Sequence, residues 1–252
     1  MIVFHRVGIL SENKKSNIKN IDISESKVIE NIKKTGHESI FVICSHSDDQ
    51  VLGPGGTLVK FAKEGAKIKT IILSYGELTP AWIKHKYTIE TRVLESEKAD
   101  KIIGGHGVEF LGLKEGKFIS EAENKNVYAH LAKLIEKEKP SIIFTHMKED
   151  PHKDHKDTLK IVEKVVKEVD TKVKPDVYSF GIWNPFILHR RAPHLVVDIS
   201  ETFKKKLEAM KCFKSQRFVI LQLTPGVIIR AKFIGFSKGY KYAETFRKVH
   251  IE

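Results

Sequence analysis

The sequence predicts an α/β fold, with a Rossmann-like, mostly parallel sheet and helices on both faces. Short apolar, β-branched runs alternate with amphipathic helical patterns at least four times along the chain, and this alternation is the signature of βαβ units. The chain has no internal repeat and no Pro/Gly-rich linker. We therefore expect one domain over residues 1–252, with a core at about 38–213 and a small β-rich C-terminal elaboration at about 214–252.

The elements are expected in the following order. An irregular arm (1–22) precedes a helix at 24–36, which Ser24 or Ser26 can cap and Gly36 can end. The apolar, β-branched runs predict strands at 39–45, 67–76, 107–113, 141–146, 176–182 and 194–200. The helical spacing of apolar residues predicts helices at 56–66, 85–103, 126–140, 155–169 and 201–213. The stretch 218–246 is interpreted as β-rich and packed on this core.

The composition bounds the class of protein. Of 252 residues, 41% are hydrophobic and 30% charged, which is typical of a folded globular chain. No apolar run approaches the roughly 18 residues of a membrane span, and the N-terminus has no signal-peptide cleavage pattern. We therefore expect a cytoplasmic protein without a membrane span. The two cysteines, Cys44 and Cys212, match no zinc-knuckle spacing.

The net charge of +12 could indicate a nucleic-acid partner. However, the lysines fall mainly on the polar faces of predicted helices. In the helix at 155–169, for example, the apolar positions repeat at helical spacing and the lysines occupy the other side. We therefore interpret the charge as solvated surface and expect no nucleic-acid partner.

Two polar clusters follow apolar strands. The segment SHSDDQ (45–50) comes directly after the first predicted strand, and HMKEDPHKDH (146–155) follows the strand at 141–146. Ligands of open parallel sheets bind beyond the carboxyl ends of the strands. We therefore expect the two clusters to meet at one edge of the sheet.

The residue types in these clusters predict a metal site. Zinc takes imidazole nitrogen and carboxylate oxygen, and a catalytic site uses three protein ligands and a water. His46 and Asp49 are three residues apart, as are His152 and His155, so each pair can face one way on a first helical turn. Asp48 is then free to act as a base. Spacing alone leaves open whether His152, His155 or both face the metal.

Other chemistries lack their signatures. No GK[ST] follows the GPGG at 53–56, so the segment is not a Walker-type phosphate loop. It is also not a GxGxxG dinucleotide fingerprint, and no GxSxG elbow marks a serine hydrolase.

With these residues in place, the chain resembles the LmbE-like / PIG-L family of zinc-dependent N-deacetylases, which act on N-acetylglucosamine units. The family motif H-P-D-D-E is matched by HSDDQ (46–50) and H-P-D-H by HKDH (152–155). The family helix R-x-x-E-x-x-x-A is matched by RVLESEKA (92–99), and KSQ (214–216) and YAETF (242–246) also look like family features. The resemblance covers roughly residues 38–246.

The resemblance implies roles for individual residues. It implies that His46, Asp49 and His155 hold one zinc ion and that Asp48 is the general base. It implies further that His152 steadies the oxyanion or protonates the leaving amine and that Asp154 orients His152. Arg92 would contact sugar hydroxyls, so the expected partner is a small-molecule N-acetylated sugar.

The sequence departs from the family pattern at Gln50, where glutamate is usual, and at Ser47 and Lys153, where proline is usual. His146 and Asp150 match loosely and are interpreted as residues at the rim or behind the ligands. A metal-binding but non-hydrolytic protein, a hydrolase of another amide or ester, another divalent ion and a homo-oligomer all stay open. Aromatic candidates for a sugar platform are Tyr75, Trp82, Tyr87 and Trp183.

Overall fold

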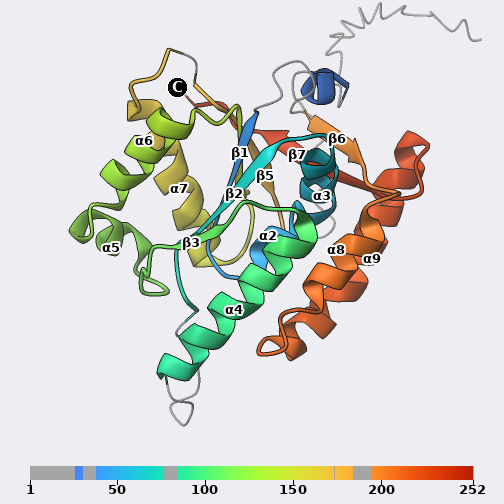
Figure 1. Ribbon diagram of the computed structural model, residues 1–252, viewed down its shortest axis with the longest axis horizontal. Coiled ribbons are helices and arrows are strands. Elements are labelled where there is room, and N and C mark those ends of the chain that lie inside the picture. Colours follow the sequence, from blue (N-terminus) through green and yellow to red (C-terminus); the bar gives the residue numbers. More distant parts are fainter. Residues whose placement is uncertain (1–25, 31–37, 77–84, 173, 184–193, 252) are drawn as a thin grey trace, which may run out of the picture.

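A seven-stranded sheet in the order β3-β2-β1-β4-β5-β7-β6 forms the centre of the molecule (Figure 1). The computed structural model describes residues 26–30, 38–76, 85–172, 174–183 and 194–251. The strands are β1 (Ser39–Cys44), β2 (Lys67–Ile72), β3 (Val108–Phe110), β4 (Ile142–His146), β5 (Asp176–Phe180), β6 (His194–Asp198) and β7 (Ala243–Lys248). Strands β1 to β5 pair in parallel, whereas β7 is antiparallel to β5 and β6. The predicted α/β fold is confirmed.

Helices cover both faces of this sheet (Figure 1). They are α2 (Asp49–Leu52), α3 (Gly55–Lys63), α4 (His85–Ile103), α5 (Phe118–Asn124), α6 (Val127–Glu138), α7 (Lys153–Glu168), α8 (Phe203–Met210) and α9 (Arg217–Lys238). Side chains of the fully buried strand β1 alternate between two core clusters: Ile40 and Val42 join one, and Phe41 and Ile43 join the other. This alternation follows from the two-residue period of a strand, and burial on both faces explains why the β1 segment is apolar throughout.

The strand order places a topological switch point beside β1. From β1 the chain extends the sheet through β2 and β3 on one side, and then returns to add β4 and β5 on the other side. A crevice opens at the carboxyl ends of the two strands where the order reverses. The two polar clusters of the sequence follow β1 and β4, so the fold brings them to this crevice.

The predicted β-rich C-terminal elaboration is wrong for most of its length. Residues 217–238 form the long helix α9, and only β7 is a strand. β-Branched residues such as Val219 and Ile228 favoured a strand locally. The helix is nevertheless stabilised by packing, because Ile220, Val227 and Ile234 recur at helical spacing and are buried.

Helix α9 also bears on the expected absence of a membrane span. Among the described residues it is the one helix long and apolar enough to cross a bilayer, and 28% of its apolar window is buried. Core helices of soluble proteins meet the same requirements, so this is weak evidence for a span. The predicted arm (1–22) and most of the helix at 24–36 lie outside the described residues, and residues 26–30 are helical.

A buried ion pair joins the C-terminal region to the segment that follows β1. The Nζ atom of Lys206 lies 2.6 Å from Oε1 of Glu244 and donates to the carbonyl oxygens of Leu52 (3.0 Å) and Gly53 (2.8 Å). Glu244 accepts in turn from the backbone N–H of Gly56 and from the N–H and hydroxyl of Thr57. The ammonium therefore sits at the C-terminus of α2 and the carboxylate at the N-terminus of α3, where each charge is favoured.

We expect Glu244→Ala to lower the free energy of unfolding by about 3–5 kcal/mol, because it leaves the buried Lys206 ammonium without its counter-charge. Glu138→Ala is the matched control, since it breaks a partly exposed pair with Lys69 (3.1 Å) and should cost less than about 1 kcal/mol. Denaturant titration of both variants tests this, and equal costs would contradict the role of the buried pair.

Candidate metal centre

The turn after β1 directs two carboxylates into the crevice. Asp48 is the N-cap of the short helix α2, and Asp49 is its first residue. The Oδ2 atom of Asp49 accepts a hydrogen bond from the backbone N–H of His46 (2.8 Å), which closes the turn and fixes the carboxylate. Asp48 and Asp49 are both buried.

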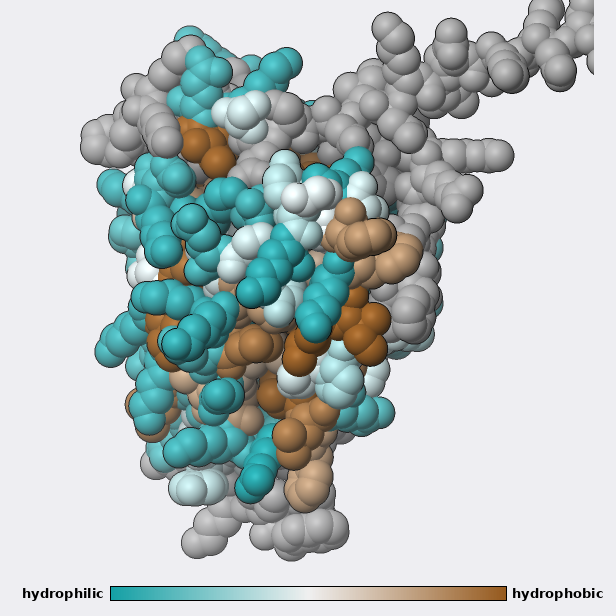
Figure 2. Space-filling model, turned by 90° about the vertical axis from the view of Figure 1, so that its right-hand side faces the viewer, coloured by the Kyte–Doolittle hydropathy of each residue, from teal (hydrophilic) through white to brown (hydrophobic). Residues whose placement is uncertain are grey.

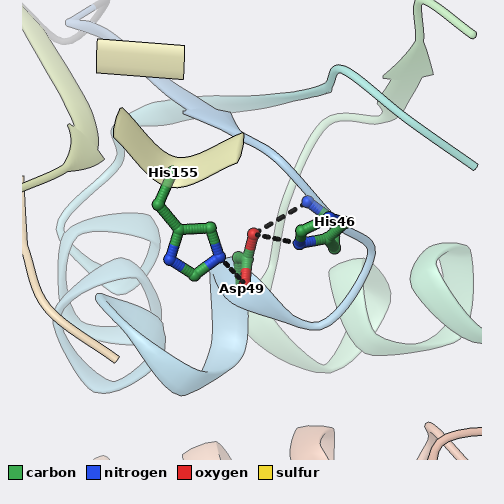
Figure 3. A group of neighbouring side chains, drawn as sticks. All are labelled: His46, Asp49 and His155. Atoms are coloured by element: carbon green, nitrogen blue, oxygen red, sulfur yellow. Dashed lines mark hydrogen bonds and ion pairs between the residues drawn. The ribbon is translucent and has the colours of Figure 1, made fainter. Parts of the chain in front are cut away.

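The Asp49 carboxylate lies among three imidazoles (Figure 3 shows two of them). Its Oδ2 atom is 3.6 Å from Nδ1 of His46 and 3.1 Å from Nε2 of His146, and its Oδ1 atom is 3.6 Å from Nε2 of His155. Burial alone would raise the pKa of Asp49, but His155, His146 and His46 together lower it well below its usual range. Asp49 is therefore a carboxylate anion that can bind a cation.

The three predicted metal ligands converge. One ligand atom from each of His46, Asp49 and His155 lies within 4.8 Å of the others. His46 and Asp49 come from the end of β1, whereas His155 comes from the first turn of α7, after β4. Two imidazoles and a carboxylate are a donor set that suits zinc. A second group within the same distance limit contains His46, His152 and Asp154.

Each of the two candidate ligand histidines, His46 and His155, also has a carboxylate at its far nitrogen. Nδ1 of His155 is 3.0 Å from Oδ1 of Asp150, and Nε2 of His46 is 3.5 Å from Oδ2 of Asp154 and 3.4 Å from Oε1 of Glu115. Metal-bound histidines usually donate their other N–H to such a group, which fixes the ring and strengthens the ligand. This arrangement fits a metal better than a purely structural cluster, because both rings turn their free nitrogens toward Asp49.

Electrostatics gives His46 a second role in the metal-free protein. Burial would lower the pKa of His46, but its hydrogen bond to Asp154 and the charges of Asp49, Glu115 and Asp48 outweigh burial and raise the pKa to about 9. The imidazolium then supplies positive charge among these carboxylates. A metal ion must displace its proton on binding.

Asp48 has the properties of a base. Burial, followed by repulsion from Asp49, raises the pKa of Asp48 to about 6, although His46 and Arg92 act in the opposite direction. A general base works best with a pKa near the working pH. Asp48 lines the pocket beside the three candidate ligands.

His152 is the N-cap of α7, and its Nδ1 accepts a hydrogen bond from the backbone N–H of Asp154 (3.2 Å). Burial and the nearby imidazoles of His46 and His155 lower its pKa, so the neutral ring carries its proton on Nε2. The role of Asp154 in orienting His152 stays a prediction. The Asp154 carboxylate accepts from the backbone N–H of Gly116 (2.8 Å) and lies 3.5 Å from Nε2 of His46, in the group that also contains His152.

These residues border a pocket of about 160 Å³. Its lining residues are His46, Asp48, Asp49, Leu52, Arg92, Glu115, His152, His155, Ile182, Trp183, Gln216, Val219 and Leu223. Besides the histidines and aspartates of the two clusters, the lining has the polar residues Arg92, Glu115 and Gln216 and five apolar or aromatic side chains. Helix α9 supplies Val219 and Leu223, and Gln216 is its N-cap.

Arg92 lines the pocket, as predicted for a substrate-binding residue, and its Nη1 donates to the carbonyl oxygens of Tyr75 (3.2 Å) and Gly76. Of the aromatic candidates, only Trp183 lines the pocket among the described residues. Tyr75 stacks on Phe110 with 5.0 Å between ring centroids, and Tyr87 is 68% exposed on α4. Trp82 lies outside the described residues.

The structure defines the positions of several residues whose place in the site the sequence did not predict. His146 is fully buried and stacks on His155 with 3.8 Å between ring centroids, and Asp150 is buried behind His155. Glu115 was missed, because nothing in its local sequence marks the loop that carries it. Gln50 is fully buried, and among the described residues neither of its amide atoms has a hydrogen-bond partner.

Comparison with known proteins identifies the family. The family model described as PIG-L: GlcNAc-PI de-N-acetylase matches residues 41–166, half of the chain, including both clusters. The chain belongs to the PIG-L (LmbE-like) family. The family is metal-dependent, and its members include deacetylases of GlcNAc-type conjugates.

Individual relatives are distant. Diacetylchitobiose deacetylase of Thermococcus kodakarensis is 23% identical over 98% of this chain and 95% of its own. The 4-oxalmesaconate hydratase of Pseudomonas putida is 25% identical over 72% of this chain and 75% of its own. The N,N'-diacetylchitobiose deacetylase structure from Pyrococcus horikoshii has the same fold, with a TM-score of 0.72 and 20% identity over 88% of this chain and 89% of that chain.

Metal binding should release a proton at pH 7.5. The pKa of His46 is raised to about 9, so this ring is protonated at pH 7.5 and must become neutral to bind. Apparent metal affinity should therefore rise with pH up to about 9, by about tenfold per unit. Calorimetric titration with zinc in buffers of different ionisation enthalpy measures the proton count. A pH-independent affinity with no proton released would contradict the assignment of His46.

Asp150→Asn should weaken metal affinity by about 10–100-fold, because the carboxylate that orients His155 loses its charge. Asp157→Asn is the matched control, since this acid lies on the same helix as His155 and contacts Lys153 and Lys160 instead. Competition with a chromophoric chelator gives both dissociation constants. Equal affinities in the two variants would show that Asp150 does not act through His155.

Proposed function

We propose that this protein is a zinc-dependent hydrolase that removes an N-acetyl group from an N-acetylglucosamine-type sugar conjugate. The observation that carries the proposal is the convergence of His46, Asp49 and His155 next to a buried carboxylate, Asp48, that no ligand role claims. Deacetylases among the relatives support the choice of an amide as substrate.

The residues present would hold one zinc ion through His46, Asp49 and His155. Bound there, the ion supplies Lewis acidity for the amide carbonyl and acidifies a water molecule toward a pKa of about 7. Another divalent ion could serve the same purpose. The protein surroundings then decide where protons and substrate go.

Asp48 takes a proton from the attacking water. With a pKa raised to about 6, its carboxylate is mostly ionised at pH 7 and is still basic enough to accept a proton. His152 lines the same pocket, and its Nε2–H is available because Nδ1 is occupied by the backbone N–H of Asp154. It would donate to the developing oxyanion or to the leaving nitrogen. The products are acetate and a free amine.

Other residues that line the pocket would bind the sugar conjugate. Arg92 and Gln216 offer hydrogen bonds to hydroxyl groups, and Trp183 offers an aromatic surface. The apolar residues Leu52, Val219 and Leu223 face the rest of the ligand. The prediction of a small N-acetylated sugar substrate is kept on these grounds.

A second candidate is water addition to an unsaturated carboxylic acid. The relative from Pseudomonas putida is named as a hydratase and is as similar to this chain as the deacetylases are. A metal and a buried carboxylate base can activate water for either reaction. Assays of zinc-loaded protein with N-acetylglucosamine conjugates for acetate release, and with unsaturated dicarboxylic acids for loss of absorbance, separate the two.

Asp48→Asn should keep the metal and lose turnover by about 10²–10⁴-fold, because the amide cannot accept the proton. The metal-free variant should also be more stable than the wild type at pH 7 by about 2–3 kcal/mol, since the buried charge that raises the pKa from 3.8 to about 6 is removed. Acetate release, metal content and thermal unfolding are the measurements. Full activity in Asp48→Asn would mean that another group is the base.

A further inference from the structure

Helix α9 exposes an apolar stripe on the side that faces away from the core. We define the outer stripe as Phe218, Leu221, Gln222, Pro225, Ile229, Lys232, Phe233 and Phe236, all of which are exposed. Spacings of three and four residues place them on one face of the helix. Phe218 and Phe236 are 88% and 87% exposed. Figure 2 faces the side of the molecule on which α9 lies and shows apolar side chains gathered among hydrophilic ones.

The size of this surface is unusual for a monomer. An aromatic side chain carries about 150–250 Å², so the three phenylalanines of the outer stripe expose roughly 450 Å² at their exposed fractions of 88%, 57% and 87%. Leu221, Ile229 and the neighbouring Tyr240, each 41–58% exposed, bring the total to roughly 700 Å². The largest apolar patch of a typical monomer is about 300–600 Å², whereas each partner in a stable interface buries about 800 Å².

The outer stripe is also complementary to itself. Reversal of the helix about Val227 exchanges Phe218 with Phe236, Leu221 with Phe233 and Pro225 with Ile229. The same reversal exchanges Gln222 with Lys232, so each apolar residue meets an apolar one and each polar residue meets a polar one. Such a pattern is what a two-fold interface requires, because the same patch must face itself with its direction reversed.

From this pattern we propose that α9 is a self-association surface, on which a second copy of this chain packs its own α9 antiparallel about a two-fold axis near Val227. The five apolar side chains Phe218, Leu221, Ile229, Phe233 and Phe236 form the buried contact. At two symmetric places the ammonium of Lys232 donates to the side-chain carbonyl of Gln222 of the other copy.

A membrane surface fits these observations less well. Helix α9 has four basic residues and no acidic one, which would attract anionic lipids. However, Gln222 and Lys232 lie within the outer stripe, and acyl chains would leave the Gln222 amide without a partner. The helix is also fixed to its own protein, since Ile220 and Ile234 are buried and Arg230 donates to the carbonyl oxygen of Gly181. A second copy satisfies both polar side chains.

The mass in solution tests the proposal directly. Light scattering after size exclusion should give about twice the chain mass of 28.8 kDa, or a multiple of that dimer, for the wild type. Phe233→Ser combined with Phe236→Ser should halve it, and both side chains are more than half exposed, so the fold should persist, as circular dichroism would verify. Tyr87→Ser, an exposed aromatic on α4, is the control and should leave the mass unchanged.

Two substitutions at one position test the two-fold pairing itself. Gln222→Lys places two ammonium groups together at both symmetric places and should raise the dimer dissociation constant by roughly tenfold at low salt. Gln222→Glu creates an ion pair with Lys232 and should lower it. Sedimentation equilibrium gives both constants.

Three different results would overturn the proposed dimer. A monomeric wild type, or an oligomer that none of these substitutions changes, would overturn the proposal. So would a monomer that binds vesicles of phosphatidylglycerol and phosphatidylcholine and loses this binding in the Phe233→Ser, Phe236→Ser variant. None of these readouts depends on enzymatic activity.

Discussion

A buried carboxylate, Asp49, organises the crevice. It faces imidazoles that come from the ends of two neighbouring strands and from the helix after the second of them. A lone buried anion is unstable, so the site needs positive charge. In the metal-free protein this charge comes from His46, whose pKa is raised to about 9, and a bound metal ion would replace the proton. Asp48 can stand beside Asp49 only because such a cation offsets their repulsion.

The surrounding fold serves this arrangement. The topological switch beside β1 creates the crevice. The buried pair of Lys206 and Glu244 joins the end of α2 to the start of α3. Asp150 and Asp154 face the far nitrogens of His155 and His46. The price of the arrangement is stability, because a carboxylate base with a raised pKa is a buried charge with too few partners. Such a compromise is typical of functional sites.

Much of the fold could be predicted from the sequence, because it depends on local patterns. For the ligands, the spacing left His152 and His155 open, and only the family resemblance favoured His155. The apolar run before SHSDDQ and the helical spacing after HKDH fixed the strands and helices that carry His46, Asp49 and His155. Contacts between distant segments could not be predicted. The carboxylate of Asp154 lies 3.5 Å from Nε2 of His46, and Glu115 reaches the site from an unmarked loop. The segment of helix α9 was predicted to be β-rich because it carries apolar residues on both faces of the helix. Such a distribution conceals the helical period of the sequence.

The most direct test of the central claim is the metal content per chain of the wild type and of His155→Ala, measured side by side by elemental analysis after exposure to zinc. The structure predicts about one zinc per wild-type chain, because two imidazoles and one carboxylate converge there. It predicts loss of that ion in His155→Ala, with the fold retained. Equal metal content in the two proteins, or none in the wild type, would contradict the assignment of His46, Asp49 and His155 as a metal centre.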